Sequence, residues 1–364
     1  MSIYLTPSRL KRIRRSNAAG IAWMVNKEHY WSEEALREIL KRIEALCHED
    51  TEQAAAAGKS ALEILERRVV EPSPGLRALV MAVYGTTLRV NGRLEQALEV
   101  FEEALKGEGL GRVAKSDILL RMTGTLVFLD QFERGLEAVE SSLTLVPNQP
   151  VSLAVRGWVH MVSGNFQCAL RDCLSVLDFA DRLPPTDLSV FSAIVNGAAC
   201  LSYEAGVDVS GEILDKLQRS ILRFRALLAK GGSSFYKVQR IRLMISRSEA
   251  LVLARTGKTD RAIKMLSRVV RGLEGKFSDN ALDASIDLMC LLAKCGDGQG
   301  AAKEAKRGLV LAERAKIRPV LCAMNVFRAS AQQTSLTTVE TAELRIRLRS
   351  REKVATCFRQ DLVA

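Results

Sequence analysis

The stretch YGTTLRVNGRLEQALEVFEEALKG, residues 84–107, has the pattern of a helix, a short turn and a second helix. Gly85 lies in the first half, and Ala97 and Ala104 flank Phe101 in the second half. Two antiparallel helices approach each other closely only where small side chains meet. The stretch therefore predicts a tightly packed helix pair with Phe101 in the seam.

The same pattern occurs five times along the chain. Each copy has a turn, then a small residue, then apolar residues at helical spacing. The small residues are, in order, Ala97, Gly135, Ala169, Ala262 and Ala301, and in the first four copies another small residue lies twelve positions earlier, at 85, 123, 157 and 250. Spacings of this size are typical of helical repeat proteins. An ordinary helical bundle with accidental similarity is the alternative.

At these residues the chain resembles the tetratricopeptide repeat (TPR) family. The resemblance is strong over 78–111, 116–149 and 150–183, and weaker over 243–276 and 282–315. It implies an all-α fold, namely a right-handed α-solenoid of antiparallel helix pairs (a TPR-like superhelix). The related pentatricopeptide repeats, which bind RNA, fit less well because the spacing here varies between 34 and 39 residues.

The repeats divide the chain into five expected regions. These are an N-terminal helical capping region with a degenerate repeat (1–70), three TPR-like repeats (72–183), an irregular longer helix pair (184–242), two degenerate TPR-like repeats (243–316) and a C-terminal capping segment (317–364). Terminal repeats need a polar outer face, which is the reason for placing a cap at each end.

Composition favours a helical, cytoplasmic protein. Hydrophobic residues make up 48% and aromatic residues only 5%, and no apolar run approaches a membrane span. The N-terminal charges are not followed by an apolar segment, so no secretory signal is expected. Eight cysteines in apolar helical contexts predict reduced, buried thiols. With three histidines and no CxxC spacing, we expect no metal and no cofactor.

The positive charge is concentrated in one region. Residues 216–271 hold fifteen Lys and Arg but only two acidic residues, although the whole chain has a net charge of +11. In the last helix of this region the cations fall on one side, as a basic stripe of Arg261, Lys264, Arg268 and Arg271. Such a stripe attracts an acidic protein or nucleic acid, or is only a solvated outer face.

The TPR resemblance implies a concave groove lined by the first helix of each pair. Carried over position by position, the groove candidates are Thr86, Arg89, Phe128, Trp158, Arg247, Arg255 and Lys294. Trp158 is a candidate binding hot spot, although a Trp on a helix more often serves partly buried packing. The Lys and Asn set that chaperone-binding members use is not present at these positions.

No catalytic residues emerge from the sequence. It has no phosphate-binding GxxxxGK, no GxGxxG after a strand, no HExxH and no GxSxG. We therefore expect no enzyme, and instead a non-enzymatic scaffold or regulatory adaptor that binds a protein or peptide, with an acidic partner compatible with the charge. A nucleic-acid-associated regulator using the basic 216–271 region is the alternative. No membrane association is expected, and the sequence leaves the oligomeric state open.

Overall fold

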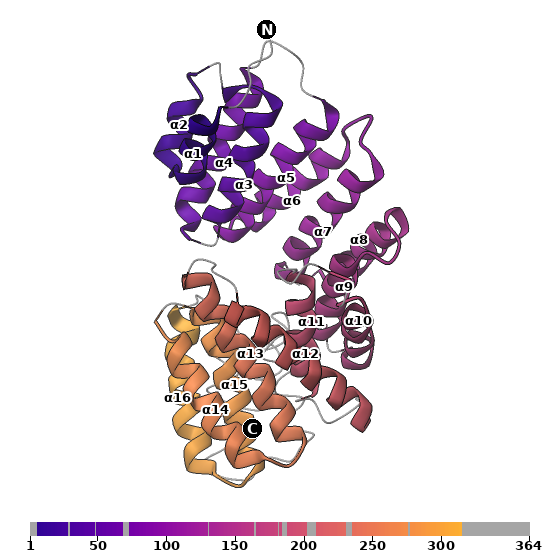
Figure 1. Cartoon of the computed structure of the whole chain (residues 1–364), viewed down its shortest axis with the longest axis vertical. Coiled ribbons are helices and arrows are strands. Elements are labelled where there is room, and N and C mark those ends of the chain that lie inside the picture. Colours follow the sequence, from indigo (N-terminus) through magenta and orange to yellow (C-terminus); the bar gives the residue numbers. More distant parts are fainter. Residues whose placement is uncertain are drawn as a thin grey trace, which may run out of the picture. The chain divides into compact units, whose positions relative to one another are not determined.

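A computed structural model describes residues 6–27, 30–47, 49–67, 73–129, 131–163, 165–180, 182–183, 188–201, 209–230, 235–275 and 277–314. These residues form sixteen helices and no strand (Figure 1). The expectation of an all-α solenoid of helix pairs is confirmed. The expected C-terminal capping segment, 317–364, lies outside the described residues.

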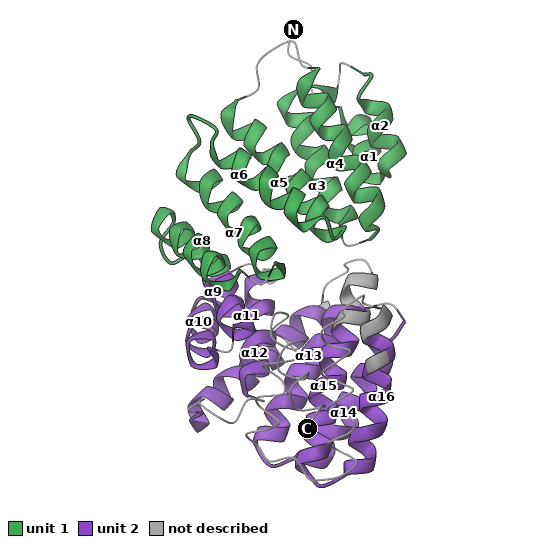
Figure 2. Cartoon of the chain, turned by 180° about the vertical axis from the view of Figure 1, so that it is seen from behind, with its two compact units in different colours: residues 1–152 green, residues 153–364 purple. Residues whose placement is uncertain are grey.

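The chain divides into two compact units, residues 1–152 and 153–364 (Figure 2). Unit 1 contains eight complete helices among its described residues. They are α1 (Pro7–Arg15), α2 (Ala18–Met24), α3 (Glu33–Leu46), α4 (Thr51–Glu66), α5 (Pro74–Val90), α6 (Leu94–Leu105), α7 (Arg112–Phe128) and α8 (Phe132–Leu145). Helix α1 packs against α3, and α2 packs against α4.

Unit 2 is also built of helices. The described helices are α9 (Pro150–Val162), which begins just before the boundary, α10 (Phe166–Phe179), α11 (Leu188–Leu201), α12 (Gly211–Lys230), α13 (Phe235–Arg255), α14 (Thr259–Leu273), α15 (Ser278–Lys294) and α16 (Gly298–Arg314). Each of α13 and α15 packs against the helix that follows it, as in a repeat of helix pairs.

Local sequence signals account for several helix ends. The Ser32 hydroxyl accepts a hydrogen bond from the Ala35 amide at 3.2 Å and caps α3. Asp50 caps α4 in the same way, accepting from the Gln53 amide at 3.0 Å. The turn after α5 contains Gly92 with φ +78°, a left-handed conformation that glycine adopts without steric cost.

The seam between paired helices is built as the repeat pattern predicts. Ala97 and Phe101 of α6 are fully buried, and a Cβ placed on Gly85 of α5 would lie 2.9 Å from the Phe101 ring. In unit 2, a Cβ on Gly157 would lie 3.3 Å from the carbonyl oxygen of Ala169. Small residues therefore set the distance between the helices of a pair.

Two features differ from the expected organisation. The N-terminal region holds four helices, α1 to α4, where a single degenerate pair was expected to cap the array. Helix α13 begins at Phe235, before the expected repeat boundary at 243. In addition, no described helix combines the length and apolarity that crossing a bilayer requires.

The cysteines only partly match the expectation of buried thiols. Cys47, Cys173, Cys200 and Cys290 are buried, and Cys168 is partly buried. Cys295 is exposed because it follows the last residue of α15 in the turn toward α16. Cys322 and Cys357 lie outside the described residues.

Candidate functional site

The first helices of unit 1 share one face. Helices α3, α5 and α7 pack side by side, with α5 in the middle. We call this surface the first-helix face and define it by six side chains that contact one another or share neighbours on it: Glu44, Thr86, Arg89, Asp117, Arg121 and Phe128.

Arg121 of α7 is the centre of a polar network on this face. Its Nε donates to Asp117 Oδ2 at 2.8 Å, one turn earlier on the same helix, and its Nη2 donates to Glu44 Oε1 of α3 at 2.7 Å. Its Nη1 donates to the hydroxyl of Thr86 on α5 at 3.2 Å. An ion pair therefore joins α3 to α7 across α5 on this face.

Arg89 of α5 lies beside this network and has no acidic partner among the described residues. Its guanidinium carbon is 5.8 Å from the centre of the Phe128 ring, and its buried Nε forms no hydrogen bond within the described part of the chain. Burial lowers the pKa of Arg89, and repulsion from Arg121 lowers it further. Arginine nevertheless stays charged in proteins, so Arg89 is a partly buried cation.

The thiol nearest to Arg89 does not neutralise it. Burial raises the pKa of Cys47 to about 11, although the positive charge of Arg89 acts in the opposite direction. The thiol is therefore protonated and neutral at physiological pH. The carboxylates of Glu44 and Asp117 are both bound to Arg121. Arg89 therefore remains a cation that no described carboxylate compensates.

A cation of this kind suits a carboxylate from outside the chain. Arginine presents a planar fork of donors that can bind a carboxylate with two parallel hydrogen bonds. Gly124 of α7 faces the Arg89 side chain, and even a Cβ at that position would only reach ordinary contact, 3.8 Å from Arg89 Cδ. The Phe128 ring beside the guanidinium adds an apolar surface that an aliphatic or aromatic side chain can contact.

The structure brings together three of the predicted groove residues, Thr86, Arg89 and Phe128. Sequence reasoning missed Glu44, Asp117 and Arg121. Asp117 and Arg121 are four residues apart in α7, a spacing that favours a helical ion pair and could have been recognised. The partner Glu44 had no sequence signal, because it lies 77 residues away.

The remaining groove candidates belong to unit 2. Arg247 is buried, and its Nε donates to Asp287 Oδ2 at 2.6 Å, with Asp283 at 3.5 Å. Its guanidinium is therefore committed to an internal ion pair rather than to an open groove. Trp158 and Arg255 are partly buried, and Lys294 is exposed. The site role of these residues stays a prediction.

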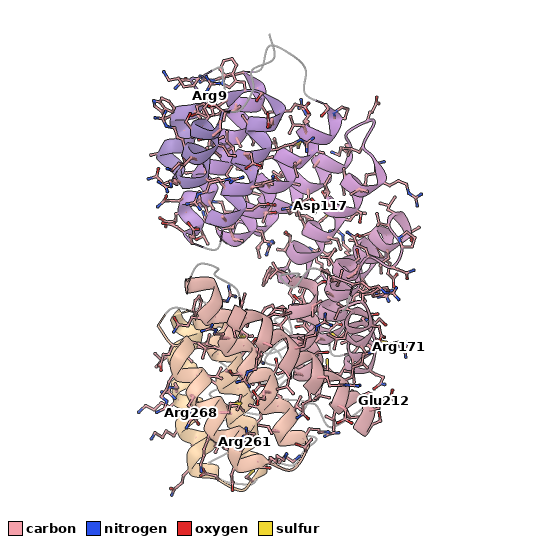
Figure 3. The ribbon with its side chains drawn as sticks, in the orientation of Figure 1. Arg9, Asp117, Arg171, Glu212, Arg261 and Arg268 are labelled. Carbon is pink, nitrogen blue, oxygen red and sulfur yellow. The ribbon has the colours of Figure 1, made fainter. Side chains whose placement is uncertain are left out.

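The basic stripe lies on the outer side of α14. Arg261, Lys264, Arg268 and Arg271 are all exposed, while Ala262 and Leu266 on the opposite side are fully buried (Figure 3 labels Arg261 and Arg268). In the described part of the chain none of the four forms an ion pair, and only Arg271 makes a side-chain hydrogen bond, to the Ser267 carbonyl of its own helix. The stripe is thus an unneutralised positive surface.

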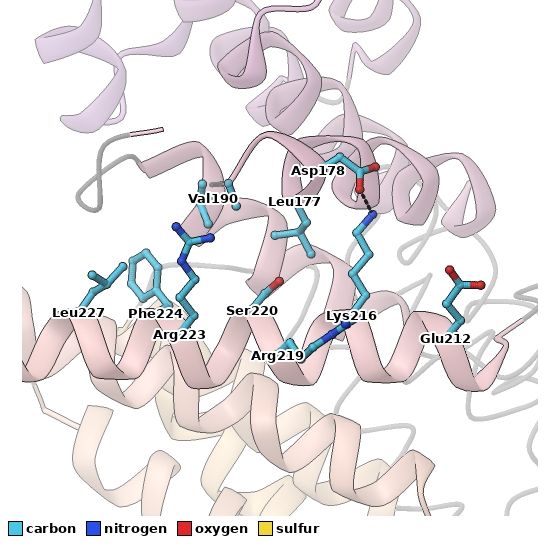
Figure 4. Close-up of a pocket in the computed structure, with 11 residues that line it drawn as sticks. Leu177, Asp178, Val190, Glu212, Lys216, Arg219, Ser220, Arg223, Phe224 and Leu227 are labelled. Carbon is cyan, nitrogen blue, oxygen red and sulfur yellow. Dashed lines mark hydrogen bonds and ion pairs between the residues drawn. The ribbon is translucent and has the colours of Figure 1, made fainter. Parts of the chain in front are cut away.

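A cavity of about 490 Å³ opens between α10, α11 and α12 (Figure 4). Leu177, Val190 and Phe224 form apolar walls, and Arg219 and Lys216 project from α12. Lys216 forms an ion pair with Asp178 of α10 (dashed in Figure 4). The mixture of apolar walls and partly neutralised charges gives this cavity no preference for one class of ligand.

Comparison with known proteins identifies the fold but not the function. No family model matches the sequence, and no curated protein matches it. Among solved structures, a Rap protein complexed with Competence and Sporulation Factor is similar with a TM-score of 0.62 and 14% identity, covering 90% of each chain. NprR in complex with its cognate peptide NprX is similar with a TM-score of 0.54 and 14% identity, over 91% of this chain and 93% of that one.

A third similar structure is that of a protein with a tetratricopeptide repeat sensor. A STAND protein with a tetratricopeptide repeat sensor, PH0952 from Pyrococcus horikoshii, is similar with a TM-score of 0.52 and 12% identity, over 98% of this chain and 52% of that one. The present chain has the fold of a TPR-like repeat protein. Identities this low establish the all-α solenoid fold alone and leave the function and the partner open.

Proposed function

We propose that the chain is a non-enzymatic scaffold or regulatory adaptor of the cytoplasm, and that it binds a segment of another protein on the first-helix face of unit 1. The observation that carries the proposal is Arg89, a partly buried cation whose Nε has no hydrogen bond to any residue that the structure describes. Leaving a charge away from water and without a partner is costly. A carboxylate of a bound segment offsets that cost.

The surroundings of Arg89 define the expected segment. Arg121 is already neutralised by Glu44 and Asp117, so the face offers one cation rather than a broad basic patch. The Phe128 ring lies next to that cation. An acidic residue followed or preceded by an apolar residue therefore complements the face. NprR binds its cognate peptide NprX, which supports a peptide as the first class of partner to test.

The test is a selection of random peptides displayed on phage against the full chain. The wild type is compared with Arg89→Gln and with the matched control Arg77→Gln, which removes the same charge from an exposed position of the same helix. We expect the wild type and the Arg77 variant to enrich the same peptides, each with an Asp or Glu beside an apolar residue. Enrichment of those peptides by the Arg89 variant would contradict the proposal.

A further inference from the structure

The outer surface of unit 1 carries a charge pattern opposite to that of α14. Helix α6 has four glutamates and no basic residue. On α8, Glu133, Glu137 and Glu140 are exposed and follow one another at intervals of four and three residues. We define the acidic face as Glu95 and Glu99 of α6 together with Glu133, Glu137 and Glu140 of α8.

The two helices present their glutamates as one surface. Arg134 of α8 donates to Glu102 Oε1 of α6 at 2.9 Å, which ties the outer sides of α6 and α8 together. The five glutamates of the acidic face are all exposed, and none of them forms an ion pair with any described residue. The acidic face is therefore as unneutralised as the basic stripe of α14.

The spacing of the charges matches between the two surfaces. Lys264, Arg268 and Arg271 are separated by four and three residues, as are the three glutamates of α8. With a rise of about 1.5 Å per residue, both rows place charges about 6 and 4.5 Å apart along a helix axis. Two helices lying side by side can therefore pair all three charges at once.

We propose that the basic stripe of one copy of this chain binds the acidic face of a second copy. The two surfaces belong to different units, so in a head-to-tail contact one copy keeps its acidic face free and the other keeps its basic stripe free. Such a heterologous contact forms rings or open chains. The association is weak and salt-sensitive, because each exposed ion pair changes an association constant by roughly fivefold or less.

A nucleic acid is the competing occupant of the basic stripe. Proteins that bind single strands combine cations with aromatic side chains that stack on the bases. Helix α14 contains no aromatic residue, and Asp260 adds a negative charge near its first turn. Carboxylates at helical spacing complement the stripe better than a strand of phosphates, and the chain itself supplies those carboxylates on α6 and α8.

Sedimentation velocity of the full chain at rising concentration tests the proposal. The basic-reversed variant changes the whole stripe to glutamate, and the acidic-reversed variant carries Glu133→Lys, Glu137→Lys and Glu140→Lys. Both sets are exposed, and circular dichroism checks that each variant keeps its helices. A control with the same charge change as the basic-reversed variant replaces four scattered exposed arginines by glutamate, namely Arg77, Arg112, Arg171 and Arg182.

We expect the wild type and the control to associate in low salt and to dissociate as salt shortens the range of the charges. Each reversed variant alone stays monomeric, and an equimolar mixture of the two associates again because opposite faces are restored between copies. A mixture that stays monomeric would overturn the proposal. So would a monomeric wild type in low salt, whether or not a single-stranded oligonucleotide then binds the basic stripe.

Discussion

Helices α5 and α6 approach each other closely at Gly85. The effect of Gly85→Ala on stability therefore depends on one neighbouring side chain, Phe101. A Cβ on Gly85 would lie 2.9 Å from the Phe101 ring, closer than a carbon contact allows. Overpacking of this kind costs about 1–3 kcal/mol. Replacing a helical glycine by alanine gains about 1 kcal/mol of helix propensity. We therefore expect Gly85→Ala to reduce the stability of unit 1 by up to about 2 kcal/mol.

The same substitution behaves differently when the ring is removed. In a Phe101→Leu background the added methyl group no longer meets the ring, while the propensity gain remains. Gly85→Ala then becomes neutral or stabilising, although Phe101→Leu itself is destabilising because it trims a fully buried side chain. The two substitutions are thus strongly coupled.

The assay is urea unfolding followed by tryptophan fluorescence. A Trp158→Phe background leaves Trp23 and Trp31 as the fluorescent reporters, and both lie in unit 1. The coupling is the difference between the effect of Gly85→Ala with phenylalanine and with leucine at 101. Equal destabilisation in both backgrounds would show that the two side chains do not meet and would refute the repeat register.

Three further predictions concern charges and thiols. Arg89→Leu should leave the unliganded chain as stable or more stable in urea, because it removes an uncompensated cation; a loss of more than about 2 kcal/mol would mean that Arg89 is a structural residue. Arg247→Ala should destabilise unit 2 by about 3–5 kcal/mol, since it leaves the buried carboxylate of Asp287 without its arginine. A change of less than about 1 kcal/mol in the free energy of unfolding, measured by calorimetry, would contradict this. Iodoacetamide at neutral pH should label exposed Cys295 much faster than Cys47, whose pKa is raised to about 11, as peptide mass mapping can check; equal rates would contradict the burial of Cys47.

The sequence predicts the helix pairs because their determinants are local. Gly85, Ala97 and Phe101 are close along the chain, and their spacing alone requires a tight seam. The exposure of the α14 stripe follows in the same way from helical periodicity. Both features depend on residues within one or two adjacent helices, where spacing along the chain determines spacing in the fold.

The contacts that the sequence did not predict join segments that are far apart along the chain. The pairing of Arg121 with Glu44 depends on how α3, α5 and α7 pack side by side, which no single repeat encodes. Arg247 was expected on an open face and is instead buried against Asp287, because α13 and α15 pack against each other at that point. Helix α13 begins at Phe235, before the expected boundary at 243, because the spacing of the repeat anchors does not determine where a helix starts.

The most direct test of the central claim is a double-mutant cycle on a peptide selected by the wild-type chain. Binding is measured by fluorescence anisotropy for the wild type and Arg89→Gln, each with the acidic peptide and with its Asp or Glu changed to the amide. A direct contact between Arg89 and the carboxylate predicts a coupling of about 1.5–3 kcal/mol, the size of a hydrogen bond to a charged group. The two changes would instead be additive if the peptide binds elsewhere, and that result would contradict the assignment of the first-helix face as the binding site.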